Sequence, residues 1–436
     1  MLQRLKSVVP PRADVDVAQA LAPAIELIDA VRAQGSRALF DQAERFDRVR
    51  PAALRVPPEA LEEALSALSE PVRAALEQTI DRVRRASVAQ LPQPSTTELA
   101  AGAVIEQRWV PVRRVGLYVP GGKAVYPSSV IMNVVPAQAA GVTEVVIASP
   151  PQAEHGGLPH PTILATCALL GVEEVYGMGG AGAIGALAYG VPDADLEQVD
   201  VITGPGNVFV AAAKRAVAGR VAIDAEAGPT EILIIADDSG DAELIAHDLI
   251  SQAEHDELAG SVLVTDSARL ADEVDAAVER LVRQTRHADR VRAALEGRQS
   301  AIVLVDDLDE AVQISNDYAP EHLQVMVRDP ENVVDQIRNA GVVFVGDHAP
   351  VALGDYAAGS NHVLPTGGTA RFAAGLNASV FVRAQQIVRY SHEGLAGVRD
   401  AIETLAQEED LPAHGRAVTA RFEVKDTDAL PVLPQS

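Results

Sequence analysis

From about residue 103 onward, short runs of Val and Ile alternate with Ala-rich stretches of helical spacing. Apolar runs of this length fit strands buried on both faces of a parallel sheet, and the stretches between them fit the connecting helices. The alternation therefore predicts an α/β fold with two doubly wound, mostly parallel, Rossmann-like domains and small helical N- and C-terminal elements. The expected strands are 145–148, 175–178, 199–203, 232–236, 262–265, 302–305, 323–327 and 342–345.

The two ends of the chain lack this alternation. Pro58 and Pro71 suit the first turns of helices, and apolar residues repeat at helical spacing through most of the first ninety positions. After about Leu376 the strand pattern is lost, and helices are expected. The predicted division is an N-terminal helical arm, a two-segment first Rossmann-like domain, a second Rossmann-like domain and a C-terminal helical tail that packs on a partner subunit. Their residues are 1–19, 20–117 with 231–376, 118–230 and 377–436.

Charge and cysteine content limit the classes of partner and metal site. The formal net charge of −25 argues against nucleic acid and anionic membrane surfaces, which bind basic side chains. The single cysteine, Cys167, excludes an intrachain disulfide and a cysteine-cluster metal site, so a metal would need His, carboxylate and amide ligands. No apolar export segment follows the first charged residues, and the longest uncharged stretch, 124–143, contains Pro, Ser and Asn residues that suit lipid poorly. We expect a soluble cytoplasmic protein.

Three Gly-rich turns stand at expected strand-to-helix junctions, at 116–122, 177–185 and 204–207. Backbone N–H groups in such turns can approach a phosphate, so the turns together favour an anionic or nucleotide ligand. The second turn also matches the dinucleotide-binding spacing G-x-G-x-x-G. No acidic residue ends a following strand about twenty positions on, however, and matches of this kind arise by chance in an Ala/Gly-rich chain.

Two polar pairs are candidates for chemistry. Gln252 and His255 are three residues apart in a helix expected over 241–258, so both would project from one face. They are either a ligand pair for a borderline metal or a polar helix end, and spacing alone favours the latter. Glu321 and His322 lead directly into an apolar strand, as a general base with its orienting partner or as a salt-bridged strand start.

Two further regions complete the set. The segment 354–362 is polar and Gly-flanked, and it carries Asp355 and His362 with little to anchor it, which is more typical of a site than of a linker. In the tail, His414 follows Glu409 by five residues, and the simplest interpretation is a surface histidine.

Long motifs in this chain resemble those of the histidinol dehydrogenase family. They occur in the same order from about Val17 to Val424 and consist mainly of polar loop residues rather than helix filler. They are GLYVPGG, YPSSVIMNVVPAQAAG, ITGPGNVFVAAAK, DAEAGPTE, LISQAEHD, APEHL and GDYAAGSNHVLPTGGTAR.

The resemblance implies oxidation of L-histidinol to L-histidine through L-histidinal, in the last steps of histidine biosynthesis. Two hydrides would pass to NAD, and one zinc ion per subunit would hold the substrate. The implied partner is a second copy of the chain, in a homodimer with shared active sites in which His414 is donated by the neighbouring subunit.

The family's residue roles map onto named positions of this sequence. The implied zinc ligands are Gln252, His255, Asp355 and His414. The implied acid/base residues are Glu321 and His322. Substrate contacts fall on Thr230, His362 and Glu409 in addition to those six residues, and NAD contacts fall on Tyr118, Gly182 and Asn207.

Two positions depart from the family pattern. Gly182 stands where Gln is usual, which removes a neutral hydrogen bond to the cofactor worth about 0.5–1.5 kcal/mol. Thr230 stands where Ser is frequent, and it keeps the hydroxyl group.

Three other functions fit parts of the pattern. One is a related zinc- and NAD-dependent dehydrogenase for another small alcohol, such as a sulfonated diol; the presence of His362 and Glu409 favours histidinol instead. The others are a catalytically silent nucleotide-binding homologue and a metal-free Rossmann dehydrogenase that uses the turn at 177–182. Retention of all the implied ligands and of both acid/base residues argues against the silent homologue.

Overall fold

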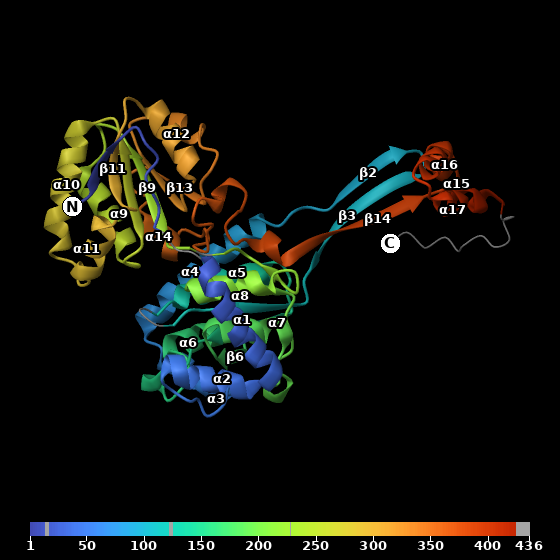
Figure 1. The fold of residues 1–436 in the computed structure, drawn as a ribbon, viewed down its shortest axis with the longest axis horizontal. Helices are drawn as coiled ribbons and strands as arrows, with labels where there is room; N and C mark the ends of the chain where they lie inside the picture. The colour runs from blue at the N-terminus through green and yellow to red at the C-terminus, as the bar shows by residue number, and fades with distance from the viewer. Residues whose placement is uncertain (14–16, 122–124, 227, 424–436) are drawn as a thin grey trace. The chain divides into compact units, whose positions relative to one another are not determined.

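The structure is a computed structural model that describes residues 1–13, 17–121, 125–226 and 228–423. The chain forms two compact units. The first comprises Met1–Leu91 with Pro111–Val382, and the second comprises Pro92–Val110 with Arg383–Ser436. The first unit contains two parallel sheets with helices on both faces, so the predicted α/β class is confirmed (Figure 1).

The larger sheet of the first unit has six parallel strands in the order β1-β11-β10-β9-β12-β13. They are β1 (Gln3–Lys6), β9 (Glu231–Ala236), β10 (Gly260–Thr265), β11 (Ala301–Leu304), β12 (His322–Met326) and β13 (Val342–Val345). Helices α9 (Ala242–Ala253), α10 (Ala268–Val282) and α11 (Ala288–Glu296) cover one face, and α12 (Leu308–Tyr318) with α13 (Pro330–Val334) covers the other. The four central strands, β9 to β12, are buried on both faces and are therefore mainly apolar, whereas the edge strand β1 is polar and half-exposed.

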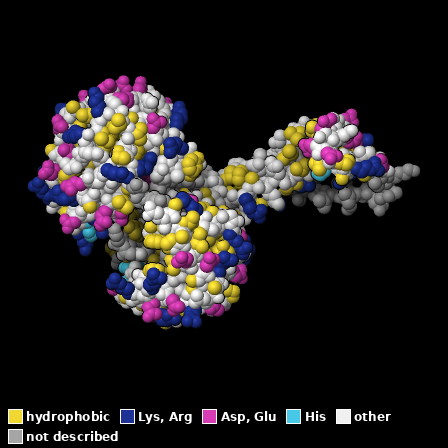
Figure 2. Space-filling view, viewed as in Figure 1, with side chains coloured by type: hydrophobic (Ala, Val, Ile, Leu, Met, Phe, Trp, Pro, Cys, Tyr) yellow, Lys and Arg dark blue, Asp and Glu magenta, His cyan; other side chains and the backbone are white. Residues whose placement is uncertain are grey.

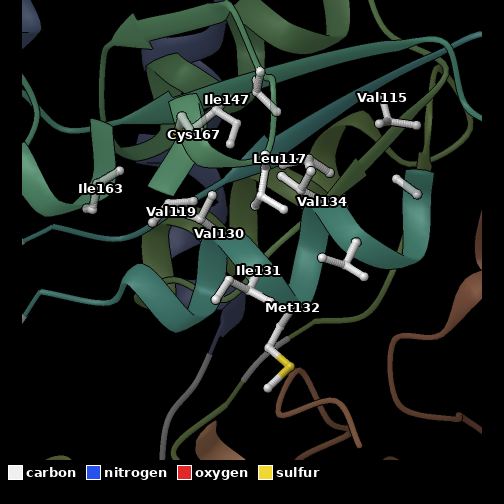
Figure 3. Packing of buried hydrophobic residues seen from close by; sticks show 14 of the residues in the cluster. Val115, Leu117, Val119, Val130, Ile131, Met132, Val134, Ile147, Ile163 and Cys167 are labelled. Atoms are coloured by element: carbon white, nitrogen blue, oxygen red, sulfur yellow. The ribbon is translucent and has the colours of Figure 1, made fainter. Parts of the chain in front are cut away.

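The smaller sheet has five parallel strands in the order β6-β5-β4-β7-β8. They are β4 (Arg114–Tyr118), β5 (Glu144–Ser149), β6 (Glu174–Gly177), β7 (Val201–Thr203) and β8 (Ala222–Ile223). Helices α5 (Pro127–Ala139) and α6 (Pro161–Leu169) lie on one face, and α7 (Gly180–Tyr189) and α8 (Val208–Val217) lie on the other. Figure 3 shows the first of these cores, where Leu117 faces Val134 of α5 and where Cys167 is buried. Every strand expected from the sequence is present, with bounds within two residues.

The N-terminal helices pack on the smaller sheet's layer of helices. Helix α1 (Val17–Gln34) contacts α7 and α8, α3 (Pro58–Ala67) contacts α6, and α4 (Glu70–Ala89) contacts α5, while α2 (Ser36–Gln42) follows α1. This differs from the predicted grouping of 20–117 with 231–376. Helical periodicity identifies the buried face of a helix, but not the sheet against which that face packs.

Two further features were not expected from the sequence. Residues of the predicted helical arm form β1, which pairs with β11 at the edge of the larger sheet. The second unit contains an antiparallel sheet, β14-β3-β2, built from β2 (Ser95–Ala100), β3 (Ala103–Pro111) and β14 (Val382–Tyr390). The strands β2 and β14 are polar and largely exposed, and β3 is half-buried with polar and apolar residues mixed, so none has the buried apolar run that marked the predicted strands. The expected tail helices are α15 (His392–Ala396), α16 (Arg399–Glu408) and α17 (Pro412–Glu423).

The surface carries charges of both signs. Figure 2 shows acidic and basic side chains interspersed over the visible face of the first unit. Among the residues that the structure describes, no helix has both the length and the apolar character needed to cross a membrane.

Candidate active site

Polar residues gather at the amino ends of β9 and β12, two adjacent strands of the larger sheet. Thr230 directly precedes β9, and Glu321 directly precedes β12, whose first residue is His322. Ligands of open α/β sheets usually bind at the carboxyl ends of the strands, so this location does not follow from the fold class.

Glu321 is buried at the start of β12. Its Oε2 atom accepts hydrogen bonds from Thr230 Oγ1 at 2.5 Å and from the backbone N–H of Glu231 at 2.9 Å. Burial raises the pKa of Glu321 to about 8, because the carboxylate loses its hydration, and the two hydrogen bonds only partly oppose this. Burial therefore favours the protonated form of this side chain in the metal-free protein.

His322 is held in one tautomer. Its Nδ1 atom lies 3.0 Å from the backbone oxygen of Glu231, and a carbonyl oxygen can only accept, so Nδ1 carries the proton. Burial lowers the pKa of His322, an effect that the nearby carboxylate of Asp355 partly opposes. The neutral ring keeps Nε2 as a proton acceptor, which is the form that a general base requires.

Gln252 offers an unsatisfied oxygen beside this pair. Its Nε2 atom donates to Thr230 Oγ1 at 2.7 Å, whereas its buried Oε1 atom has no hydrogen-bond partner among the described residues. Burying a hydrogen-bond acceptor without a partner costs free energy, and a bound cation would satisfy this oxygen.

His255 and Asp355 lie together near the end of α9. The Nε2 atom of His255 is 3.7 Å from Oδ2 of Asp355. Burial would lower the pKa of His255, but the adjacent carboxylate of Asp355 outweighs it and raises that pKa. Asp355 belongs to the short helix α14 (Val351–Tyr356), which contacts α9, rather than to the loop expected from the sequence. Val351 is buried and anchors that helix.

The helix that carries Gln252 is shorter than the sequence suggested. It ends at Ala253 instead of 258, so His255 lies in the following turn and not on a shared helix face. The chain has to reverse here because β10 begins at Gly260. The turn holds the two backbones together, since the backbone N–H of His255 donates to the carbonyl oxygen of Gln252.

His362 contacts helix α14, which packs beside the larger sheet, and helix α5, which packs on the smaller sheet. Its Nδ1 atom is 3.1 Å from the backbone oxygen of Asp355, and its Nε2 atom is 3.2 Å from Ser129 Oγ in the first turn of α5. The neighbouring Asn361 donates to the backbone oxygen of Met132 at 2.6 Å, also in α5. These contacts hold His362 beside Asp355, and burial lowers the pKa of its ring.

The residues expected to contact NAD lie on the smaller sheet. Tyr118 ends β4 and accepts a hydrogen bond at Oη from the backbone N–H of Gly180 at 3.1 Å; burial raises its pKa to about 12. Asn207 caps α8, with Oδ1 accepting from the N–H groups of Phe209 and Val210. Because β4 and β7 adjoin where the strand order reverses, both residues stand at the position where dinucleotides bind in doubly wound sheets.

Two glycines of these turns have structural reasons to be glycine. Gly204 has φ +116°, and a Cβ atom there would overlap the carbonyl oxygen of Tyr118, so the turn after β7 requires glycine. At Gly182 in α7, the place of a Cβ atom is taken by the side-chain amide of Gln42. A larger residue at 182 would have to displace Gln42. Gly122 of the first turn lies outside the described residues.

The structure brings three of the four expected metal ligands into the first unit. Glu409, the C-cap of α16, and His414, in α17, belong to the second unit. Within the described residues, no group of three His, Cys, Asp or Glu side chains is arranged to hold a metal. The expected set differs from such a group because it uses the amide of Gln252 and a histidine from the second unit.

Comparison with known proteins decides the family. Residues 11–422 match the family model described as histidinol dehydrogenase. The chain is 60% identical over 413 residues to a histidinol dehydrogenase of Leifsonia xyli subsp. xyli, covering 95% of each, and 55% identical over 419 residues to that of Thermobifida fusca, covering 96% and 95%. The crystal structure of histidinol dehydrogenase from Elizabethkingia anophelis superimposes with a TM-score of 0.90 at 30% identity, covering 97% of this chain and 98% of that one.

The chain belongs to the histidinol dehydrogenase family. It is therefore an oxidoreductase, and the resemblance seen in its sequence motifs is confirmed.

For this member of the family, sequence reasoning missed the residues that orient the site. Glu231 contacts both Glu321 and His322 through its backbone, and Ser129 contacts His362. Both lie inside motifs that carried the resemblance, DAEAGPTE and YPSSVIM, but neither had been assigned a role. A Glu at the start of an apolar strand and a Ser in an apolar helix were the available signals.

The raised pKa of Glu321 predicts a pH-dependent difference in stability. The folded state holds this proton up to about pH 8, whereas the unfolded chain releases it near 4.5. The stabilisation is thus complete below pH 4.5 and is lost as the pH rises through 8, by up to about 5 kcal/mol. In metal-free protein, denaturant unfolding of the wild type compared with Glu321→Gln should show the wild type losing stability relative to the variant over this interval. A constant difference from pH 5 to 8 would contradict the buried-carboxyl assignment.

Proposed function

We propose that this chain oxidises L-histidinol to L-histidine through L-histidinal, with two hydride transfers to NAD and one zinc ion per subunit. The proposal extends to a place in the last steps of histidine biosynthesis and to a cytoplasmic location. The observation that carries it is the buried Glu321–His322 pair beside Gln252, whose Oε1 atom finds no hydrogen-bond partner in the part of the chain that the structure describes, in a chain of this family.

The side chains present fit a zinc ion. Gln252 Oε1, His255 Nε2 and a carboxylate oxygen of Asp355 would be its ligands in the first unit, with His414 as a fourth. This N/O donor set is one that zinc accepts without cysteine. Bound zinc would supply the positive charge that holds the imidazole and amine of the substrate.

The acid/base pair suits both oxidation steps. In the first, His322 Nε2 takes the proton of the alcohol as the hydride leaves carbon, which yields the aldehyde. In the second, one water adds to the aldehyde, and the deprotonated Glu321 takes a proton from that water before the second hydride leaves. NAD supplies the hydride acceptor, which zinc cannot be. Thr230 and Glu231 keep Glu321 in place through both steps.

The remaining assignments are those that the resemblance to the family implies. Tyr118, Gly182 and Asn207 would face NAD at the carboxyl edge of the smaller sheet, and Thr230 and His362 would contact the substrate beside the metal ligands. Glu409 and His414 would reach the site from a second copy of the chain, which would make the active form a homodimer with shared sites. The second unit would then have a catalytic purpose.

Turnover with and without metal tests the proposal. Each L-histidinol should yield two NADH, a chelator should abolish NADH formation, and added Zn²⁺ should restore it. No turnover with zinc restored would overturn the proposal. Turnover of a sulfonated diol but not of L-histidinol would show a related dehydrogenase with the same cofactors instead.

A further inference from the structure

Arg12 lies in the segment that precedes α1. It binds two separate elements: strand β9 of the larger sheet and the end of helix α12, which covers that sheet. Its Nε and Nη2 atoms donate to the two carboxylate oxygens of Glu231 at 2.8 and 3.0 Å, which is a bidentate pair. The same Nη2 atom donates to the backbone oxygen of Tyr318 and approaches that of Ala319 at 3.4 Å. One guanidinium group thus joins the first residue of β9 to the C-terminal end of α12.

Both of these parts hold the acid/base pair. Glu231 donates its backbone N–H to Glu321 and accepts from Nδ1 of His322 through its carbonyl oxygen, so a shift of Glu231 would move both partners. On the other side, the turn at Ala319 leads through Pro320 directly to Glu321. Ala319 has φ +49°, a conformation that a residue other than glycine keeps only when its surroundings enforce it.

The buried carboxylate of Glu231 depends on Arg12 for a positively charged partner. Its side chain is 5% exposed, and its other carboxylate partner is Tyr318, whose Oη donates at 3.1 Å. The guanidinium carbon of Arg12 also lies 3.8 Å from the centre of the Tyr318 ring. A buried carboxylate that loses its cation is strongly unfavourable, so without Arg12 the side chain of Glu231 would have to reorient.

We propose that Arg12 is a positioning residue for the acid/base pair: by binding the Glu231 carboxylate and the Tyr318–Ala319 turn together, it fixes Glu321 and His322 relative to each other. This rests on the proposed function, in which those two residues move the protons. Arg12 acts through Glu231 and the turn and does not itself touch the reacting atoms.

A pocket beside Arg12 makes this role testable by chemical rescue. It has a volume of about 280 Å³ and is lined by Arg12, Thr230, Glu231 and Tyr318, among others. Truncation of Arg12 would enlarge it next to the Glu231 carboxylate. A guanidinium ion from solution could then bind where the side chain had been.

The test measures histidinol-dependent NADH formation in zinc-loaded enzyme. Arg12→Ala should lower kcat at least tenfold and change KM for NAD less than twofold, and millimolar guanidinium chloride should restore activity several-fold. Arg12→Lys should fall between this variant and the wild type, because an ammonium group cannot bond both carboxylate oxygens in parallel.

Arg114→Ala is the matched control. Like Arg12, Arg114 binds a carboxylate bidentately, that of Glu174 at 3.0 and 2.5 Å, and it lies buried at the amino end of β4. Its removal should lower the melting temperature without guanidinium rescue of kcat. A folded Arg12→Ala enzyme with kcat within twofold of wild type would overturn the inference, and so would equal losses in both variants without rescue.

Glu231→Gln decides the matter where Arg12→Ala does not fold. This variant keeps the backbone contacts to Glu321 and His322 but loses the charge that Arg12 binds. A kcat within twofold of wild type in Glu231→Gln would overturn the inference. Wild-type turnover serves as the reference throughout: its absence would overturn the proposed function and this inference with it, whereas an active wild type with insensitive variants would overturn the inference alone.

Discussion

Replacing His322 with Asn is expected to leave zinc bound and to lower kcat by about 10²–10⁴-fold. The amide of Asn can still donate to the backbone oxygen of Glu231, as Nδ1 of His322 does at 3.0 Å, so the local structure should persist. What disappears is the second ring nitrogen, the proton acceptor of the neutral imidazole. Steady-state NADH formation together with zinc content measures both halves of this expectation.

His348→Asn is the control for that experiment. His348 is exposed, so the same substitution there should leave kcat and zinc content unchanged. An unchanged rate in His322→Asn would remove His322 from the mechanism. Loss of zinc in the same variant would show instead that its ring is part of the metal site.

The second large effect is expected at His255. His255→Ala removes a nitrogen ligand and leaves Asp355 without the partner 3.7 Å away, so zinc should dissociate and nearly all turnover should be lost. Elemental analysis after gel filtration gives the zinc content, and NADH formation at saturating L-histidinol gives the activity. Unlike His322→Asn, this variant should lose both.

His247→Ala is matched to His255→Ala, because His247 is an exposed histidine on α9, the helix that ends two residues before His255. It should retain zinc and full activity. Full zinc occupancy in His255→Ala would exclude this residue from the ligand set and leave the role of Gln252 Oε1 without its proposed explanation.

The sequence was most informative where burial dictates composition. The strands from β9 to β12 are buried on both faces, so their apolar residues predicted their positions to within two residues. The strands β2 and β14 are exposed and polar, and their pairing in the second unit left no comparable pattern. The helical spacing of apolar residues indicated the buried face of α1. Its contacts with α7 and α8 depend on a part of the chain more than 140 residues away.

The candidate site also contains residues that the sequence could predict and contacts that it could not. Glu321 and His322 could be singled out because two ionisable groups stood at the start of an apolar strand. The contacts that orient them could not, because Arg12 meets Glu231 across 219 positions and Ser129 meets His362 across 233. The shift of His255 from helix to turn depends on where β10 begins, which local helical spacing does not encode.

Glu321 and His322 lie at the amino ends of the strands of the larger sheet, and this location has a practical consequence for protein engineering. The turns that follow β10 and β11 lie at the carboxyl ends of the strands, opposite to the pair. They carry the exposed residues Asp266 and Asp306. Affinity tags, fluorescent labels or inserted peptides should therefore be tolerated at these turns with little loss of turnover. In many nucleotide-binding sheets the corresponding loops are the ones that cannot be altered.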